Sequence, residues 1–217
     1  MTHDRQKLHR RSLRLNGYDY TLAGAYFVTI VTEGRRHLFG EVADGEIRLS
    51  EAGRMLYNVW MDLPKYYPGV ELDAFVIIMP NHIHGIIILV GAGPGACPDT
   101  AQPQGNGQPQ EVAHTLGLPG VVHRFKTMTT KLYADGVKQL GWQPFPGRLW
   151  QRNYYEHIIR NDDSLNRIRE YIAANPLRWH LDRENPKAMG QDKVWKSLFH
   201  KAASNLSHAG GQHEHHF

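Results

Sequence analysis

Two histidines, His82 and His84, stand at the start of an apolar run and are separated by a single residue. Side chains alternate across a strand, so both imidazoles would point to one face, about 7 Å apart along the strand. Two imidazoles at this spacing can share one divalent cation. The alternative is a pair of partly buried, hydrogen-bonded histidines. Gly85 follows directly and would let backbone or a ligand approach closely.

A second pair, Tyr171 and Asn175, lies near the end of the segment SLNRIREYIAANP and is spaced by four residues. In a helix this spacing places both side chains on one face, one turn apart. Leu165, Ile168 and Ile172 form the apolar stripe, which leaves Tyr171 at its margin. Taken alone, the pair is more simply explained by a tyrosine that lines the core and an asparagine that stops the helix.

Taken together, the two pairs predict a site for phosphodiester chemistry. A phenol can act as a nucleophile, but with a pKa of about 10 it is mostly protonated at neutral pH. A cation held by the two histidines and the Asn175 carboxamide would polarise a phosphodiester oxygen and stabilise a pentacovalent transition state. Attack by Tyr171 would give a covalent protein–DNA phosphotyrosine and release a 3′-hydroxyl. This strand transfer needs no nucleotide cofactor, and the sequence contains no Walker-type glycine loop.

The strands that must position these residues are predicted from apolar runs and turn residues. Residues 25–32 (AYFVTIVT) predict one strand, and residues 38–49 predict a hairpin that turns at Asp44-Gly45. Residues 72–79 and 83–90 predict two neighbouring strands, separated by Pro80-Asn81. Their nearly continuous hydrophobicity indicates central positions in the sheet.

Three amphipathic segments predict helices. The first begins at an N-cap, Ser50, and ends at Pro64. The second carries a stripe made of Val121, Phe125, Met128 and Leu132. The third is capped by Asp162 or Asp163 and stops at Asn175-Pro176. The order of elements predicts an α+β fold, an antiparallel sheet covered by helices, whose open face suits single-stranded nucleic acid.

Length and composition restrict the class of protein. A chain of 217 residues with 41% hydrophobic residues suits one domain with a real core. Cys97 is the only cysteine, which excludes a disulfide framework and a multi-cysteine zinc site. Continuous apolar stretches such as residues 86–90 are far too short to span a membrane, and the basic N-terminus has no apolar core. We therefore expect a cytoplasmic protein with no membrane partner.

Two terminal segments and one insertion differ from the rest of the chain. Residues 1–20 form a basic arm in which Arg10, Arg11 and Arg14 either bind DNA phosphates or are simply solvated. Residues 91–111 hold five glycines and four prolines, which predicts a disordered insertion within one domain at 21–185. Residues 186–217, with a histidine-rich end, are expected to be a largely disordered extension.

Three further cations lie on or near the helix that carries Phe125: Arg124, Lys126 and Lys131. They form either a solvated helical face or a set of phosphate contacts. Because the substrate of the predicted chemistry is a polyanion, we include them among the candidate DNA-binding residues.

Four segments, in chain order, resemble the REP-associated tyrosine transposases of the single-tyrosine HUH transposase superfamily. MPNHIHGIIIL resembles the HUH motif region, and WQRNYYEHIIR followed by EYIAANPLRW resembles the C-terminal signature of that family. RRSLRLNGYDYTLAGAYFVTI and VVHRFKTMTTKLY are also similar to it. The resemblance covers residues 10–180 or so. The His pair alone is weakly specific, whereas the ordered set of four segments is highly specific.

This resemblance implies a ferredoxin-like, RRM-like core that nicks and rejoins single-stranded DNA at hairpin-forming repeats. It implies a covalent 5′-phosphotyrosine intermediate and assistance by Mg²⁺ or Mn²⁺. By position, His82 and His84 match the metal pair, Tyr171 matches the nucleophile, and Asn175 matches the third ligand. Related transposases often carry Gln at the position of Asn175.

Two alternatives accompany this interpretation. Tyr154 and Tyr155 are adjacent, and relaxases of the wider superfamily use paired tyrosines, but helical spacing couples Tyr171 to Asn175. A non-catalytic single-stranded nucleic-acid-binding module of the same fold is the second candidate function. A histidine-triad nucleotide hydrolase would need a third alternating histidine, where the chain has Ile86. Both a monomer and a homodimer with shared sites are compatible with the sequence.

Overall fold

The computed structural model describes residues 18–90 and 117–199. Two predicted features, the insertion at 91–111 and the arm residues Arg10, Arg11 and Arg14, lie outside these ranges. The elements follow in the order β1 (Gly24–Val31), η1 (Glu33–Arg35), β2 (Gly40–Ala43), β3 (Glu46–Leu49), α1 (Glu51–Tyr66), β4 (Val70–Ile78), β5 (His82–Leu89), α2 (Leu118–Leu140), β6 (Tyr155–Ile159), α3 (Asp162–Ala173), η2 (Pro176–Leu181) and α4 (Lys193–Phe199).

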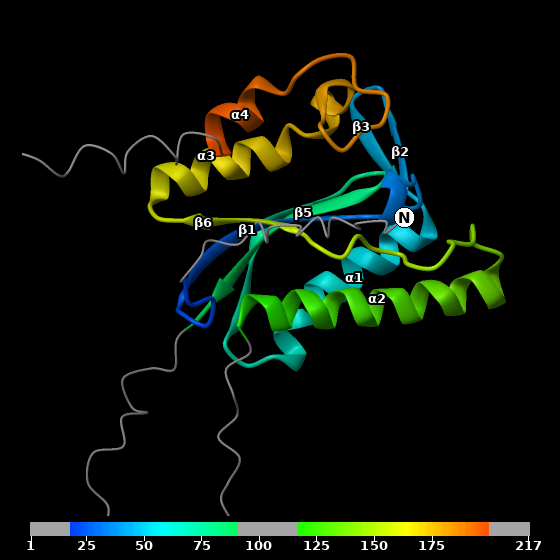
Figure 1. Cartoon of the computed structure of the whole chain (residues 1–217), viewed down its shortest axis with the longest axis horizontal. Helices are drawn as coiled ribbons and strands as arrows, with labels where there is room; N and C mark the ends of the chain where they lie inside the picture. The colour runs from blue at the N-terminus through cyan, green and yellow to red at the C-terminus, as the bar shows by residue number, and fades with distance from the viewer. Residues whose placement is uncertain (1–17, 91–116, 200–217) are drawn as a thin grey trace, which may run out of the picture.

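A four-stranded antiparallel sheet with the strand order β4-β5-β1-β6 forms the centre of the molecule (Figure 1). Helices α1 and α2 pack together on one face, and α3 and α4 lie on the other. The chain order β1-α1-β4-β5-α2-β6 is the βαββαβ arrangement of ferredoxin-like folds. The predicted α+β class, with helices over an antiparallel sheet, is confirmed.

The alternation of side chains along β5 divides its residues between two hydrophobic cores. Ile83 and Ile87 point towards α1 and α2 and join a large core with Trp60 and Phe125. Ile86 points the other way and packs with residues of α3 and α4 in a smaller core. His82 and His84 have the parity of Ile86, so the sheet directs both imidazoles to the smaller core.

The hairpin and the helix starts show how local sequence forms these elements. The β2–β3 hairpin turns at Asp44-Gly45 as predicted and forms a separate two-stranded sheet. The Ser50 side chain accepts a hydrogen bond from the Gly53 backbone N–H (3.1 Å) and caps α1, also as predicted. The cap of α3 is Asn161, whose side chain accepts from Ser164 N (2.8 Å), and neither Asp162 nor Asp163.

Other sequence-based boundaries were wrong, for identifiable reasons. Helix α1 continues through Pro64 to Tyr66 and loses one backbone hydrogen bond there. Strand β4 lies at an edge of the sheet, not at the centre. Its Asp73 is buried in an ion pair with Arg169 of α3 (2.5 Å), which covers this face of the edge strand. Leu132, on the predicted apolar stripe of α2, is 39% exposed.

Two elements near the C-terminus were not predicted. Strand β6 is short and pairs with β1 from Ala25↔Ile159 to Thr29↔Tyr155. Helix α4 falls in residues 186–217, where disorder was expected, and its Trp195 and Phe199 are buried against α3 and β6. The packed structure therefore extends beyond residue 185. No helix in the described ranges is long and apolar enough to cross a membrane.

Gly85 supplies a first test of this packing. A Cβ at this position would lie 2.4 Å from Cζ2 of Trp60, so helix α1 approaches β5 where the side chain is missing. We expect Gly85→Ala to destabilise the protein by about 1–3 kcal/mol, the usual cost of overpacking a core. Urea denaturation measures this change.

The smaller Trp60→Leu variant provides the control. In its background, Gly85→Ala should cost clearly less than in the wild type, because the two residues are in contact. Equal costs in the two backgrounds would contradict the proposed clash.

Candidate active site

The two histidines are placed by a tight turn between β4 and β5. Met79 N donates to His82 O (2.7 Å) across Pro80-Asn81, and the Pro80 carbonyl accepts from the backbone N–H groups of Leu38 and Phe39. In the sheet, His82 pairs with Val31 and His84 with Thr29. Both side chains are buried, and their Nε2 atoms are 3.0 Å apart.

Asn81 fixes the orientation and the tautomer of His82. Its Nδ2 donates to the carbonyl oxygens of Arg35 (3.1 Å) and Glu184 (2.7 Å), so its Oδ1 faces His82 Nδ1 at 2.8 Å. A carboxamide oxygen only accepts hydrogen bonds, so His82 Nδ1 is protonated, and neutral His82 presents an Nε2 lone pair to His84. Asn81 directly precedes the histidine pair, but no sequence pattern assigned it a role.

His84 has a similar partner on the neighbouring strand. Its Nδ1 lies 2.9 Å from Thr29 Oγ1, a hydroxyl that can donate or accept. When the hydroxyl accepts, His84 Nε2 also carries a lone pair, and the two facing nitrogens then need a cation between them. When the hydroxyl donates, His84 Nε2 carries the proton and donates to His82 Nε2.

A carboxylate that the sequence analysis missed completes the cluster. Asp182, at the end of η2, places Oδ2 3.8 Å from His82 Nε2, and ligand atoms of His82, His84 and Asp182 all lie within 4.8 Å of one another. Its other oxygen accepts from Glu184 N (2.6 Å), whereas Oδ2 is buried and has no hydrogen-bond partner among the described residues. Only its place shortly after the NPLRW segment could have drawn attention to Asp182.

Tyr171 and Asn175 meet the histidines from the opposite layer. The Tyr171 ring packs edge-on against the ring of His84, with centroids 5.5 Å apart. Tyr171 is 2% and Asn175 1% exposed, so Tyr171 lies inside the core and not at its margin. The Tyr171 hydroxyl and Asn175 Oδ1 are also buried without a hydrogen-bond partner among the described residues. The structure thus brings together all four residues predicted for the catalytic and metal-binding roles.

Burial keeps this cluster short of positive charge. It lowers the pKa of His82 to about 3 and that of His84 well below its ordinary value, so both imidazoles are neutral at physiological pH. Burial raises the pKa of Asp182 to about 6. Burial also raises the pKa of Tyr171, and the nearby carboxylates of Asp182 and Asp192 raise it further. The site therefore holds several oxygen and nitrogen acceptors, and the guanidinium charges of Arg178 and Arg183 act on it from nearby.

This donor set fits a divalent metal ion. Two nitrogen ligands at about 2.0–2.1 Å from an ion, at a right angle, would be about 2.9 Å apart, close to the separation of the two Nε2 atoms. Imidazole nitrogens with a carboxylate oxygen accept several divalent ions. The outer hydrogen bonds of Asn81 and Thr29 are of the kind that orient metal-binding histidines. His82, His84 and Asp182 form the candidate metal centre, and Asn175 is close to it.

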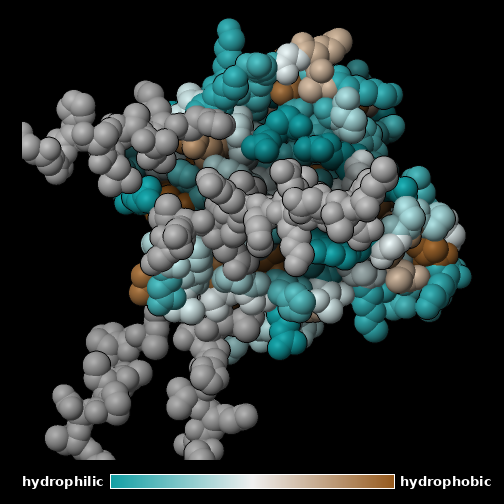
Figure 2. Space-filling view, viewed as in Figure 1, coloured by the Kyte–Doolittle hydropathy of each residue, from teal (hydrophilic) through white to brown (hydrophobic). Residues whose placement is uncertain are grey.

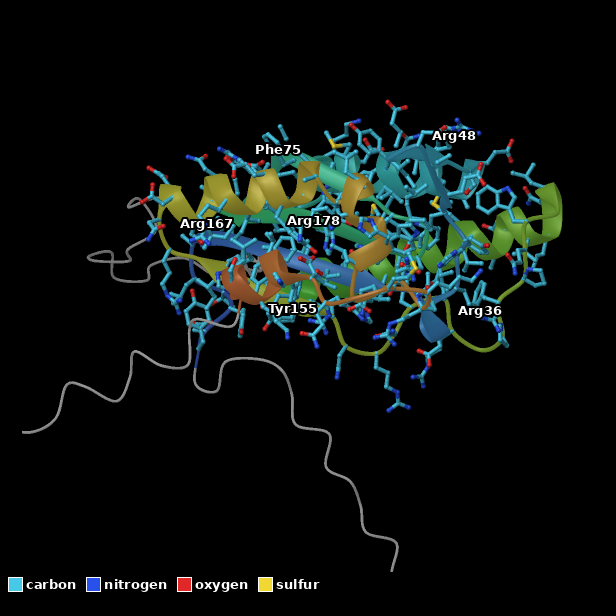
Figure 3. All side chains as sticks on the ribbon, turned by 90° about the horizontal axis from the view of Figure 1, so that it is seen from above. Arg36, Arg48, Phe75, Tyr155, Arg167 and Arg178 are labelled. Carbon is cyan, nitrogen blue, oxygen red and sulfur yellow. The ribbon has the colours of Figure 1, made fainter. Side chains whose placement is uncertain are left out.

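Aromatic side chains of α4 cover this centre. The Trp195 ring lies 5.7 Å from that of Tyr171 and 6.3 Å from that of His84, and the Phe199 ring lies 6.0 Å from that of Tyr171. Figure 3 looks onto this layer, with Tyr155 beside α4. In the space-filling view, the described part of the visible surface is mostly hydrophilic, with small separate hydrophobic patches (Figure 2).

The predicted DNA-binding cations of α2 lie on the other side of the sheet. Lys126 Nζ donates to the carbonyl oxygens of Gln151 (2.9 Å), Arg152 (3.2 Å) and Asn153 (3.1 Å), so it holds a loop in place. Lys131 is exposed and lies 3.7 Å from Asp135, and Arg124 is exposed. DNA binding by these three residues stays a prediction.

Comparisons with known proteins can be set against this geometry. No family model matches the chain. An uncharacterized protein of Haemophilus influenzae is 38% identical over 176 residues, which cover 81% of this chain and 92% of that protein. A second H. influenzae protein, provisionally named a REP-associated tyrosine transposase, is 24% identical over 160 residues, or 74% of each chain. A solved structure of a REP-associated tyrosine transposase bound to a REP hairpin gives a TM-score of 0.45, with 19% identity over 76% of this chain and 74% of that one.

The sheet topology and the buried cluster together describe a ferredoxin-like α+β protein with a candidate metal centre beside a tyrosine on a helix. Within this class, the chain belongs to the same family as the uncharacterized H. influenzae protein.

Metal binding tests the composition of the centre. We expect Asp182→Asn to weaken Mn²⁺ binding at least about tenfold, because removal of even an outer hydrogen-bond partner of a ligand commonly costs that much. Isothermal titration calorimetry of the full chain measures the affinity. Asn175→Ala shows whether the carboxamide is a further ligand.

Asp73→Asn is the matched control, since Asp73 is a buried carboxylate that pairs with Arg169 outside the centre. Unchanged affinity in Asp182→Asn would remove Asp182 from the ligand set.

Proposed function

We propose that the protein is a single-tyrosine transposase that nicks and rejoins single-stranded DNA at hairpin-forming repeats. The observation that carries this proposal is the convergence of Tyr171 with the candidate metal centre in the smaller core. A phenol from α3, two imidazoles from β5, a carboxamide from the link between α3 and η2, and a carboxylate directly after η2 meet there. The likeness to a relative named as a REP-associated tyrosine transposase supports the same function.

In this proposal Tyr171 Oη attacks the phosphorus of the scissile phosphodiester. The new P–Oη bond forms as the P–O3′ bond breaks, the phenol loses its proton to solvent, and the leaving 3′ oxygen gains one. A covalent 5′-phosphotyrosine and a free 3′-hydroxyl result. Attack by a 3′-hydroxyl on the phosphotyrosine reverses these bond changes and rejoins the strand without a nucleotide cofactor.

The residues of the site have separate tasks in this reaction. His82, His84 and Asp182, with Asn175 as the further candidate, would hold Mg²⁺ or Mn²⁺, which polarises the phosphodiester and stabilises the negative transition state. Asn81 and Thr29 keep the imidazole nitrogens turned to the centre. The carboxylate charge of Asp182 raises the pKa of Tyr171, so charge neutralisation at Asp182 favours the phenolate.

One observation favours a second candidate, a non-catalytic module that binds single-stranded nucleic acid. Tyr171 is 2% exposed and its pKa is raised by burial, so a phosphodiester cannot reach the phenol in this conformation. A transposase of this structure must therefore open the core around Tyr171, and α4, whose Trp195 and Phe199 pack on the Tyr171 ring, is the element we expect to move, whereas a binding module needs no such opening. Formation of a covalent adduct separates the two functions.

The nucleophile is tested directly. Tyr171→Phe should abolish the covalent adduct with a labelled single-stranded hairpin substrate in the presence of Mn²⁺, with hairpin affinity unchanged. A denaturing gel detects the adduct, and fluorescence anisotropy measures binding.

Tyr155→Phe is the control, because Tyr155 packs against the same Trp195 ring and belongs to the alternative tyrosine pair. An adduct that persists in Tyr171→Phe but vanishes in Tyr155→Phe would move the nucleophile to β6. No adduct in the wild type under any divalent metal would favour the binding module.

The cover over the site is tested by hydrogen exchange. Substrate that reaches Tyr171 must displace Trp195 and Phe199, so we expect backbone amides of α4 to exchange at least about tenfold faster with hairpin DNA bound than without it. Amides of α2, on the other face of the sheet, provide the internal reference. Adduct formation with unchanged exchange in α4 would show that the substrate enters by another route.

A further inference from the structure

A groove with a volume of about 680 Å³ lies between α2 and residues 147–152, away from the tyrosine layer. We propose that this groove binds the phosphodiester backbone of the DNA hairpin stem. The assignment of DNA as the ligand rests on the proposed function. The positive charge of the groove comes chiefly from Lys131, Arg148 and Arg152, which are not part of the candidate active site.

The charge of the groove suits a polyanion. Arg148 and Arg152 are exposed, and within residues 18–90 and 117–199 neither side chain has an ion-pair or hydrogen-bond partner. Lys131 contributes a third cation, 79% exposed and only 3.7 Å from Asp135. The residues that line the groove include no Asp or Glu. Three cations without an acidic side chain in the lining form the kind of surface that phosphates occupy.

The backbone that carries the two arginines is held rigidly. Lys126 Nζ bonds three consecutive carbonyl oxygens of residues 151–153. Trp150 Nε1 donates to Thr129 Oγ1 of α2 (2.9 Å), and Trp150 also forms a β-bridge with Thr32. A loop fixed in this way loses little conformational entropy when a ligand binds, which favours affinity. Lys126 thus supports the groove as a positioning residue.

The floor of the groove favours backbone over base recognition. Trp150 is only 4% exposed, so its ring offers no open face on which an unpaired base could stack. What remains accessible on the loop is mainly the guanidinium groups of Arg148 and Arg152. Guanidinium groups bind phosphates through paired hydrogen bonds.

The sheet places the groove near the candidate active site. Gln151, in the groove lining, donates its backbone N–H to the Val31 carbonyl (2.9 Å), and Val31 pairs with His82. Two strand spacings put these two backbones about 10 Å apart, with the groove on the face of the sheet covered by α2 and Tyr171 on the face covered by α3. A DNA molecule with its stem in the groove and its single-stranded end at Tyr171 must therefore pass around the sheet from one face to the other.

The experiment measures binding of a fluorescent DNA hairpin to Arg148→Gln/Arg152→Gln in the Tyr171→Phe background, over a series of salt concentrations. We expect affinity to fall about tenfold or more at moderate salt. The slope of log K against log[salt] should fall by about one unit for each phosphate that the variant no longer neutralises. An unstructured single strand of equal length should be affected less than the hairpin.

Arg48→Gln/Arg54→Gln is the matched control, since it removes two exposed arginines that do not line the groove. A groove pair that behaves like this control, with unchanged melting temperature in both, would overturn the groove assignment. A larger decrease in affinity for the single strand than for the hairpin would overturn the stem assignment. If Arg148→Gln/Arg152→Gln loses hairpin binding while the wild type forms no covalent adduct, DNA binding in the groove is supported and the transposase function is contradicted.

Discussion

The structure depends on one constraint: neutral imidazole nitrogens and buried oxygens without hydrogen-bond partners must coexist in the same small core. The Nε2 atoms of His82 and His84 are 3.0 Å apart, and three oxygens of Tyr171, Asn175 and Asp182 lack hydrogen-bond partners among the described residues. Buried acceptors without partners are expensive in a low-dielectric interior. A bound divalent ion would relieve this cost. The buried acceptors that destabilise the metal-free protein would therefore favour metal binding.

The surrounding fold maintains this arrangement from several directions. The Asn81 carboxamide is fixed by two carbonyl groups and in turn fixes His82. The Arg169–Asp73 ion pair ties α3, the helix of Tyr171, to the edge strand β4. On the opposite face, Trp60 packs over Gly85. The two faces of the sheet therefore differ in role. Helices α1 and α2 form the larger core on one face, and α3 and α4 enclose the candidate active site on the other.

Helix α4 is the main difference between this conformation and one in which the proposed reaction could occur. Its Trp195 and Phe199 rings belong to the core that contains Tyr171, so they stabilise the fold and exclude substrate at the same time. Displacement of α4 exposes both the metal centre and apolar surface, which DNA bases could cover by stacking. The groove on α2 lies on the other face of the sheet and needs no such movement, so under the proposed function DNA binding in the groove and access to the tyrosine would be physically separate events.

Local features could be predicted from the amino-acid sequence: the α+β class, the β2–β3 turn, the Ser50 cap, and the pairing of His82 with His84 and of Tyr171 with Asn175. These follow from periodicity and from short-range hydrogen bonds, which neighbouring residues control. Long-range packing was needed to put β4 at an edge, to lay α4 over the site, and to bring Asp182 and Asn81 into it. Each of these depends on which distant segments meet, and Asp182 lies 98 positions beyond His84 with no spacing rule to connect them. A carboxylate reaches this metal centre through tertiary contacts, because no local preference of the chain directs it there.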